Sequence, residues 1–441
     1  MKRTYRGSVV THKRKQQNVR NGLLKEFMLV NHWKSTGFIL LFKESMLTYM
    51  NANSTKWGGI KVIYLDNGAT TKPYKEVVDA YVTVASTYFG NPSSLHSLGM
   101  QAEGLITESR NRIADLLGVK ASEIIFTSGG TEGNNIAIKG VAHAKKKRGK
   151  HLITTQVEHA SVEEAFSRLE QDGFEVTYLP VDQFGRVSVE QIEAEIRPET
   201  TLISIIHVNN EIGTVQPIEE IGEMLENYPQ IYFHVDHVQG ISKVDLNIRK
   251  SRIDLLTCSA HKFHGMKGSG FLFVREGIQV QSLFQGGVQE SGLRAGTEHV
   301  AGIVAMAKAL RMVKANKQKQ RELTQLKNTF VTKIQAIEGV MINSPDEFVA
   351  PHIVNFSIPG TKPEVIVQSL SAKGIYVSTK SACSSKLSEP SRVLTALGLD
   401  LDRASSGIRV SFSFDTTLEE INQVIDELKI IIPELLEVVY T

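Results

Sequence analysis

A glycine-rich segment at residues 127–135 has the residue types that bind a phosphate group. Gly129, Gly130 and Thr131 follow a short apolar run and open a predicted helix. Free backbone N–H groups and the helix dipole favour an anion at such a position, and glycines let the backbone approach it. The segment lacks the dinucleotide-binding glycine pattern and the P-loop Lys-Ser/Thr pair. It therefore favours a small phosphorylated ligand over a nucleotide, with a plain strand-to-helix turn as the alternative.

Two ionisable residues at the ends of apolar runs could act on a bound ring. Asp236 ends the run 231–235, and Lys262 follows Ser259 and His261 just after the run 253–257. The carboxylate could pair with a protonated ring nitrogen, and the amine could form a Schiff base. The alternatives are a helix N-cap for Asp236 and a solvated surface charge for Lys262. Together with the phosphate-binding segment, the two residues describe a pyridoxal phosphate site.

The two cysteines of the chain lie in different surroundings. Cys383 lies among small polar residues at 381–385, which predicts an accessible and therefore reactive loop thiol. Cys258 ends an apolar run and is predicted to be an inert core residue. Two cysteines exclude a disulfide framework and a four-cysteine metal site, and they favour a reducing compartment.

A single arginine interrupts a predicted core strand. Arg409 lies between two aliphatic residues, so it either forms a buried structural ion pair or clamps a substrate carboxylate with two hydrogen bonds. His234 and His237 are spaced as metal ligands could be, but on a strand they would point to opposite faces. No third ligand accompanies them, so we predict no metal site.

These residues follow short apolar runs that alternate with helix-length amphipathic segments. The runs are 124–126, 151–153, 176–179, 202–208, 231–235, 253–257 and 270–274, and the helical segments include 131–147, 159–172, 188–197 and 218–228. Such alternation predicts an α/β fold with a parallel sheet covered on both faces. Ligands bind at the carboxyl ends of the strands in such sheets. His159 and Asn210 follow two of the runs and join the predicted site.

A second, smaller α+β region is predicted beyond a long helical stretch at about 300–337. Its strands are expected at 353–358, 375–378 and 408–412, and its closing helix at about 417–436. We therefore expect a large cofactor-binding domain at 62–320 and a small C-terminal domain at 321–441. Residues 62–75 are expected to pack on the small domain.

The first 61 residues differ from the rest in charge. They carry 12 Lys and Arg against two acidic residues, a net charge of +10, which leaves −7 for the rest of a chain whose total is +3. The acidic body gives no reason to expect a nucleic-acid surface. The extension could be a basic arm, a transit peptide or a segment outside the working protein. We favour a segment outside the working protein, because Val62 to Asn67 resembles the start of a folded domain. Detection of peptides from residues 1–61 in the native protein by mass spectrometry would refute this hypothesis. The apolar run 38–42 is too short to span a membrane.

From residue 62 to about 435 the chain resembles the pyridoxal-phosphate-dependent cysteine desulfurases of the NifS/IscS type, in the class V aminotransferase superfamily. The resemblance implies a fold type I architecture. The matching segments, all in the family's order, are 64–71, 89–94, 127–135, 207–211, 259–262, 294–297 and 381–385. Gly68, Met266, His237 and Val288 depart from the usual family residues, and none of them removes a proposed catalytic group.

The resemblance implies a role for each matching residue. Lys262 would hold the cofactor, His159 would stack on its ring, and Asp236 would pair with the ring nitrogen. The remaining cofactor-binding residues would be Gly130, Thr131, Asn210, Gln239, Ser259, His261 and, from the other subunit of a homodimer, Thr297. Arg409 would bind the carboxylate of L-cysteine, and Asn210 would also take part in substrate binding. Cys383 would take the substrate sulfur as a persulfide, and L-alanine would be released.

The resemblance also implies a cytoplasmic protein that passes sulfur to a partner. The sequence of the cysteine loop and the chain length resemble those of Gram-positive enzymes that supply sulfur to a tRNA 4-thiouridine synthetase. An iron–sulfur scaffold is the alternative acceptor. A class V aminotransferase, or another pyridoxal phosphate lyase without thiol chemistry, is the alternative. A non-enzymatic docking or RNA-binding protein is a third possibility. The joint presence of Lys262, His159, Asp236 and Cys383 argues against it, because a protein without catalysis would not need all four.

Overall fold

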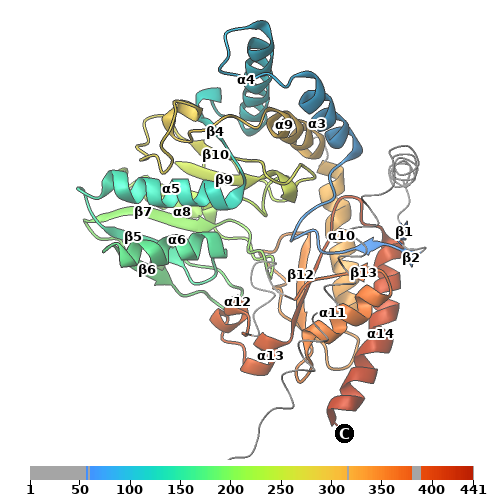
Figure 1. The fold of residues 1–441 in the computed structure, drawn as a ribbon. Coiled ribbons are helices and arrows are strands. Elements are labelled where there is room, and N and C mark those ends of the chain that lie inside the picture. Colours follow the sequence, from blue (N-terminus) through green and yellow to red (C-terminus); the bar gives the residue numbers. More distant parts are fainter. Residues whose placement is uncertain (1–55, 58–59, 315–316, 380–388, 441) are drawn as a thin grey trace, which may run out of the picture. The chain divides into compact units, whose positions relative to one another are not determined.

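The computed structural model describes residues 56–57, 60–314, 317–379 and 389–440 (Figure 1). The chain divides into two units, residues 1–62 and 63–441. In the first unit, β1 (Lys56–Trp57) pairs antiparallel with β2 (Ile60–Lys61). Most of the predicted N-terminal extension, and Cys383, lie outside the described residues. No helix in the described part of the chain is both long and apolar enough to cross a membrane.

A seven-stranded sheet forms the centre of the second unit, in the order β4-β10-β9-β8-β7-β5-β6. Its strands are β4 (Ile124–Thr127), β5 (His151–Thr155), β6 (Glu175–Leu179), β7 (Thr200–Ile206), β8 (Tyr232–Asp236), β9 (Leu255–Ser259) and β10 (Gly270–Val274). The α/β prediction is confirmed, and the pairs among β5 to β9 are parallel. β10 departs from the predicted parallel order and is antiparallel to β4 and β9. The connection 260–269 is too short for the crossover that a parallel return needs.

Helices cover both faces of this sheet. They are α3 (Lys75–Thr87), α4 (Ser97–Leu117), α5 (Gly130–Lys145), α6 (Ala160–Gln171), α7 (Val189–Ala194), α8 (Ile218–Leu225) and α9 (Val300–Lys314). Alternate strand residues point to opposite faces. Ile203 and Ile205 of β7 therefore pack in one core with α4, α8 and α9, whereas Leu202 packs in another with α5 and α6.

A smaller antiparallel sheet, β11-β12-β14, lies in the C-terminal third of the chain. Its strands are β11 (Met341–Ile342), β12 (Ile353–Ser357) and β14 (Gly407–Ser411). The helices are α10 (Lys317–Ile334), α11 (Pro363–Ala372), α12 (Arg392–Ala396), α13 (Leu401–Ser405) and α14 (Leu418–Tyr440). The predicted helical stretch 300–337 is thus described as two helices, α9 and α10.

The start of the second unit packs with this C-terminal region. β3 (Ile63–Tyr64) pairs in parallel with β13 (Ile375–Tyr376). Ile63 and Leu65 are buried in the same apolar core as β12, β14 and α14. Asp66 then forms a single bridge with Ser411 at the end of β14. This pairing brings the turn at residues 66–69 beside Arg409, across most of the length of the chain.

Candidate active site

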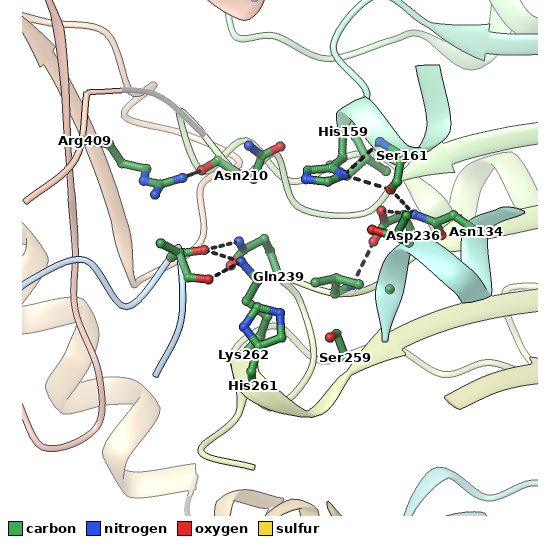
Figure 2. A pocket seen from close by; sticks show the side chains of 16 residues that line it. Asn134, His159, Ser161, Asn210, Asp236, Gln239, Ser259, His261, Lys262 and Arg409 are labelled. Carbon is green, nitrogen blue, oxygen red and sulfur yellow. Dashed lines mark hydrogen bonds between the residues drawn. The ribbon is translucent and has the colours of Figure 1, made fainter. Parts of the chain in front are cut away.

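A cavity of about 240 Å³ lies at the carboxyl ends of the central strands (Figure 2). Its walls come from seven places along the chain: the turn at Gly68, the starts of α5 and α6, the segments at the ends of β7, β8 and β9, and β14. The predicted site residues that line it are Gly130, Thr131, His159, Asn210, Asp236, Gln239, Ser259, His261, Lys262 and Arg409. Thr297 is exposed and does not line the cavity, and Cys383 lies outside the described residues.

Lys262 presents its amine to the cavity from the short helix 260–262 that follows β9. Its Nζ donates hydrogen bonds to the carbonyl oxygens of Gly68, at 2.6 Å, and Ala69, at 2.9 Å. Gln239 Nε2 donates to the same Gly68 oxygen at 2.8 Å. Backbone carbonyls cannot take the proton of an ammonium group, so they position the amine and leave it available for chemistry.

The start of α5 has features that suit an anion. Gly129 has φ +153°, a conformation that other residues rarely adopt, and a Cβ at Gly130 would approach Val238 Cγ2 to 3.0 Å. His261, on the neighbouring wall, has a buried Nδ1 without a hydrogen-bond partner among the described residues. Burial, with Lys262 nearby, lowers the pKa of His261 to about 3. A neutral histidine nitrogen and helix N–H groups are suitable donors for a phosphate.

A hydrogen-bond chain joins His159 to Asp236 (Figure 2). His159 Nδ1 accepts from the backbone N–H of Ser161 at 3.1 Å and lies 2.8 Å from its Oγ. Asn134 Nδ2 donates to Ser161 Oγ at 2.9 Å and to Asp236 Oδ2 at 2.8 Å. Burial lowers the pKa of His159, against the attraction of Asp236. Because Nδ1 is an acceptor, a neutral His159 carries its proton on Nε2.

Of the two interpretations of Arg409 left open by the sequence, the buried ion pair is confirmed, and the clamp for a substrate carboxylate stays a prediction. Its Nη2 forms an ion pair with Asp66 Oδ1 at 3.0 Å, and its Nη1 donates to the carbonyl of Asn210 at 2.8 Å. The guanidinium also lines the cavity, and its buried Nε has no partner in the described structure. Arg409 is therefore held by a structural ion pair and keeps donors for a ligand.

Sequence reasoning missed three residues of this arrangement, namely Asp66, Asn134 and Ser161. Asn134 lies four residues after Gly130, so the two occupy the same face of α5. That spacing could have identified it. Ser161 lies in the first turn of α6, where its backbone N–H is capped by the side chain of His159, two residues before it. Nothing near Asp66 in the sequence indicates Arg409, its partner.

Comparison with known proteins identifies the family. The aminotransferase class-V family matches residues 63–424. The chain belongs to the class-V aminotransferase family.

Curated relatives align along most of the length of this chain. It is 47% identical over 368 residues to the "NifS/IcsS protein homolog" of Lactobacillus delbrueckii subsp. bulgaricus, covering 82% of this chain and 95% of the relative. It is 45% identical to "Cysteine desulfurase IscS" of Dictyoglomus turgidum, covering 85% and 95%. A solved "NifS-like protein" matches with a TM-score of 0.80 and 35% identity, covering 85% of this chain and all of that one. "SspA in complex with cysteine" matches with a TM-score of 0.70 and 36% identity, covering 80% and 99%.

Pyridoxal phosphate is the cofactor of class-V aminotransferases and of the desulfurases among them, and the cavity fits it. A cavity of about 150 Å³ accepts benzene, so one of about 240 Å³ admits a substituted ring. The α5 start and the unpartnered His261 Nδ1 suit the phosphate, and the Asp236 carboxylate suits a protonated ring nitrogen. Lys262 supplies the amine. The described residues contain no group of three or more His, Cys, Asp or Glu side chains that could hold a metal.

A buried carboxyl group lies beside the cavity. Glu158 precedes His159, and its Oε1 accepts from Thr155 Oγ1 at 2.7 Å and from the Ile206 N–H at 3.0 Å. Its Oε2 is buried without a hydrogen-bond partner in the described structure. Burial raises the pKa of Glu158 from 4.5 to about 8, so the protonated form is favoured at neutral pH.

Glu158 should make the folded state less stable as the pH rises. Its pKa is higher in the folded than in the unfolded protein, so its stabilisation is complete below pH 4.5 and is lost as the pH rises to about 8. Glu158→Gln should remove this loss, which amounts to about 1 kcal/mol per pH unit within that window. Denaturant unfolding of both proteins at pH 5, 6, 7 and 8 measures the difference. Parallel stability profiles would show that Glu158 does not titrate in this range.

Proposed function

We propose that this protein is a cysteine desulfurase, which removes the sulfur of L-cysteine, releases L-alanine and holds the sulfur as a persulfide on Cys383. The observation that carries the proposal is the convergence of Lys262, Asp236 and Arg409 on one cavity. An amine, a ring-nitrogen partner and a carboxylate clamp are the groups that amino-acid chemistry on pyridoxal phosphate needs. Relatives named cysteine desulfurase, at 42–45% identity, favour this chemistry over amino-group transfer.

The residues that line the cavity bind different parts of the cofactor in the proposed function. The cofactor, when bound, supplies an electron sink that weakens the Cα–H bond of the substrate and activates the sulfur for attack by a thiolate. Asp236 would keep the ring nitrogen protonated, and His159 would stack on the ring. Gly130, Thr131, Ser259 and His261 would hold the phosphate. Asn210 and Gln239 would interact with the phenolic oxygen of the cofactor.

Lys262 and His159 move protons. Lys262, once its amine is released by the incoming substrate, takes the proton from Cα. The Gly68 and Ala69 carbonyls accept hydrogen bonds from this amine, so it has a fixed resting position at the cavity wall. His159 has its Nδ1 engaged by Ser161, which leaves the Nε2 proton to be shared with the reacting groups. Arg409 holds the substrate carboxylate.

The described residues on both sides of Cys383 support its role. Before it, Ser378 exchanges backbone hydrogen bonds with Arg409, at 2.7 and 3.1 Å. After it, Ser391 Oγ donates to Glu211 Oε2 at 2.6 Å, and Arg392 Nη2 donates to the carbonyl of Glu158 at 2.7 Å. Arg409 lines the cavity, and Glu211 and Glu158 adjoin the cavity residues Asn210 and His159. The sulfur-accepting segment therefore begins and ends beside the site.

The reaction is tested by incubating the purified, cofactor-loaded protein with L-cysteine. We expect alanine to accumulate and the peptide containing Cys383 to gain the mass of one sulfur atom, as measured by mass spectrometry. Alanine release without added sulfur on Cys383 would refute the proposed nucleophile. An aminotransferase without thiol chemistry would instead pass the amino group to a keto acid and leave both cysteines unmodified.

A homodimer is the second part of the proposal. Large apolar side chains are exposed on α3, on α4 and the segment before it, and near residue 288, and they include Phe89, Leu95, Met100 and Val288. Leu95 is 97% exposed and Val288 is 87% exposed, which is more than an isolated surface residue explains. Thr297 is exposed too, as expected of a residue that completes the partner's cavity. A second copy of the chain is the occupant that accounts for both features.

Charges placed on this apolar surface should prevent dimerisation. The double variant Leu95→Glu/Met100→Glu is expected to show half the molar mass of the wild type in light scattering, because two buried charges would oppose association. It should also lose cofactor more readily, since Thr297 of the partner subunit no longer contributes. Leu418→Glu/Ile430→Glu on α14, where both residues are exposed, is the matched control and should stay dimeric. A monomeric wild type would refute the proposal.

The last part of the proposed function concerns the sulfur acceptor and the cellular compartment. We propose that the acceptor is a protein of tRNA thiolation, such as a tRNA 4-thiouridine synthetase, or an iron–sulfur scaffold, and that the protein works in the cytoplasm. An unpaired reactive thiol requires a reducing compartment, and a persulfide needs an acceptor to complete the cycle. Mixing the persulfidated protein with each purified acceptor, and following sulfur by mass spectrometry, tests the two assignments.

A further inference from the structure

The ion pair of Asp66 and Arg409 lies where the proposed function places the substrate carboxylate. Arg409 has a side chain only 1% exposed, and its Nη2 lies 3.0 Å from Asp66 Oδ1. The carbonyl of Asn210 takes a hydrogen bond from Nη1, and the buried Nε has no partner in the described part of the chain. A guanidinium group has five N–H donors. Asp66 therefore engages one edge of a group that can still bind a second carboxylate.

Asp66 also opens the turn that holds the catalytic amine. Its carbonyl accepts from the N–H of Ala69 at 3.0 Å, and the carbonyls of Gly68 and Ala69 accept from Lys262 Nζ. Burial raises the pKa of the Asp66 carboxyl, whereas Arg409 and, less strongly, Lys262 act in the opposite direction. The carboxylate thus lies within the field of both cations of the cavity.

A buried cation requires an anion nearby. Removing a charge from water costs several kcal/mol unless a partner of opposite charge compensates. For Arg409 that partner is Asp66, which lies 343 residues away in the sequence. When a ligand carboxylate arrives, two carboxylates share one guanidinium, and their repulsion opposes binding.

We infer that Asp66 is a resident counter-ion of Arg409 that competes with the carboxylate of the bound amino acid and so limits how tightly substrate and product are held. This inference rests on the proposed function, in which Arg409 binds that carboxylate. Asp66 is a positioning residue, since it acts through Arg409 and does not itself line the cavity. Its consequence for the reaction is faster release of L-alanine.

The test is Asp66→Asn in the full-length, cofactor-loaded protein. The amide oxygen can still accept from Nη2 of Arg409, so the variant removes the charge and keeps the contact. Propionate and L-alanine should each bind roughly tenfold more tightly than to the wild type, as expected for the loss of one like charge several ångströms away. Isothermal titration calorimetry at pH 8 measures both. The KM for L-cysteine should fall, and kcat should not rise, because the product leaves more slowly.

Two further variants complete the experiment. Asp66→Glu restores the charge and should return the affinity for propionate towards that of the wild type. Asp426→Asn removes an exposed carboxylate paired with Lys429 on α14 and should change neither affinity. Unchanged or weaker propionate binding by Asp66→Asn would overturn the inference. So would failure of that variant to fold, which would assign the ion pair to stability, or a lack of propionate binding by wild type and variant alike.

Propionate has neither an amine nor a sulfur atom, so its binding does not depend on turnover. If the wild type formed no persulfide and Asp66→Asn still bound propionate more tightly, the desulfurase proposal would fail and the role of Asp66 would stand. If the wild type formed the persulfide and both proteins bound propionate equally tightly, the desulfurase proposal would stand and the role of Asp66 would fail.

Discussion

Replacement of Lys262 with alanine should lower alanine release from L-cysteine by at least about a thousandfold. Proton transfer by a positioned group contributes roughly 10² to 10⁴ in rate, and this lysine also supplies the nucleophile that binds the cofactor. Its Nζ is held at 2.6 and 2.9 Å by two carbonyl oxygens of the cavity wall. Alanine release and the visible absorption of the cofactor are the two measurements, and both should change.

Two variants separate the chemistry of Lys262 from its charge. Lys262→Arg keeps a cation at the site but removes the nucleophilic amine, so it should be as inactive as the alanine variant. Lys267→Ala removes an exposed lysine from the same β9–β10 connection and should retain full activity. A tenth or more of the wild-type rate in Lys262→Ala would mean that another group takes the proton, and the assignment of the catalytic amine would be wrong.

The sequence predicted those residues whose positions depend on strand ends. β8 and β9 are buried along their whole length, as continuous apolar runs predict, and Asp236 and Lys262 follow from where these runs stop. Parallel strands meet at one edge of the sheet, so the residues after them converge without any knowledge of the packing. The strand order could not be predicted in the same way. The short connection between the runs 253–257 and 270–274 is visible in the sequence and explains the antiparallel direction of β10, but no local pattern places β10 between β4 and β9.

Residues that act through distant partners could not be found from the sequence. Asp66 and Arg409 contact each other only because β3 joins β13 and the turn beyond it meets β14. Glu158 is equally hidden, since its raised pKa arises from burial beneath β7 and not from its neighbours in sequence. A local sequence pattern indicates which face a helix or strand buries. Two residues that only tertiary packing brings together leave no such pattern in the sequence.

Substitution of Cys383 by alanine should abolish persulfide formation and reduce alanine release to the level of a protein-free blank. The reacting sulfur needs a thiolate to accept it, and no other side chain of the proposed site can form a sulfur–sulfur bond. The visible absorption of the cofactor should be unchanged, because Lys262, Asp236 and the phosphate-binding wall are intact. Mass spectrometry of the intact protein after incubation with L-cysteine measures the added sulfur.

The chain carries its own matched control for this experiment. Cys258 is fully buried in β9, and burial raises its pKa well above the usual value, so its thiol stays protonated and unreactive. Cys258→Ala should therefore form the persulfide at the wild-type level, with only the loss of stability that a small buried side chain causes. If the persulfide disappeared in Cys258→Ala or survived in Cys383→Ala, the assignment of the sulfur-accepting thiol to Cys383 would be wrong. Opposite results in the two variants would establish that one accessible thiol accepts the sulfur while the other serves the core.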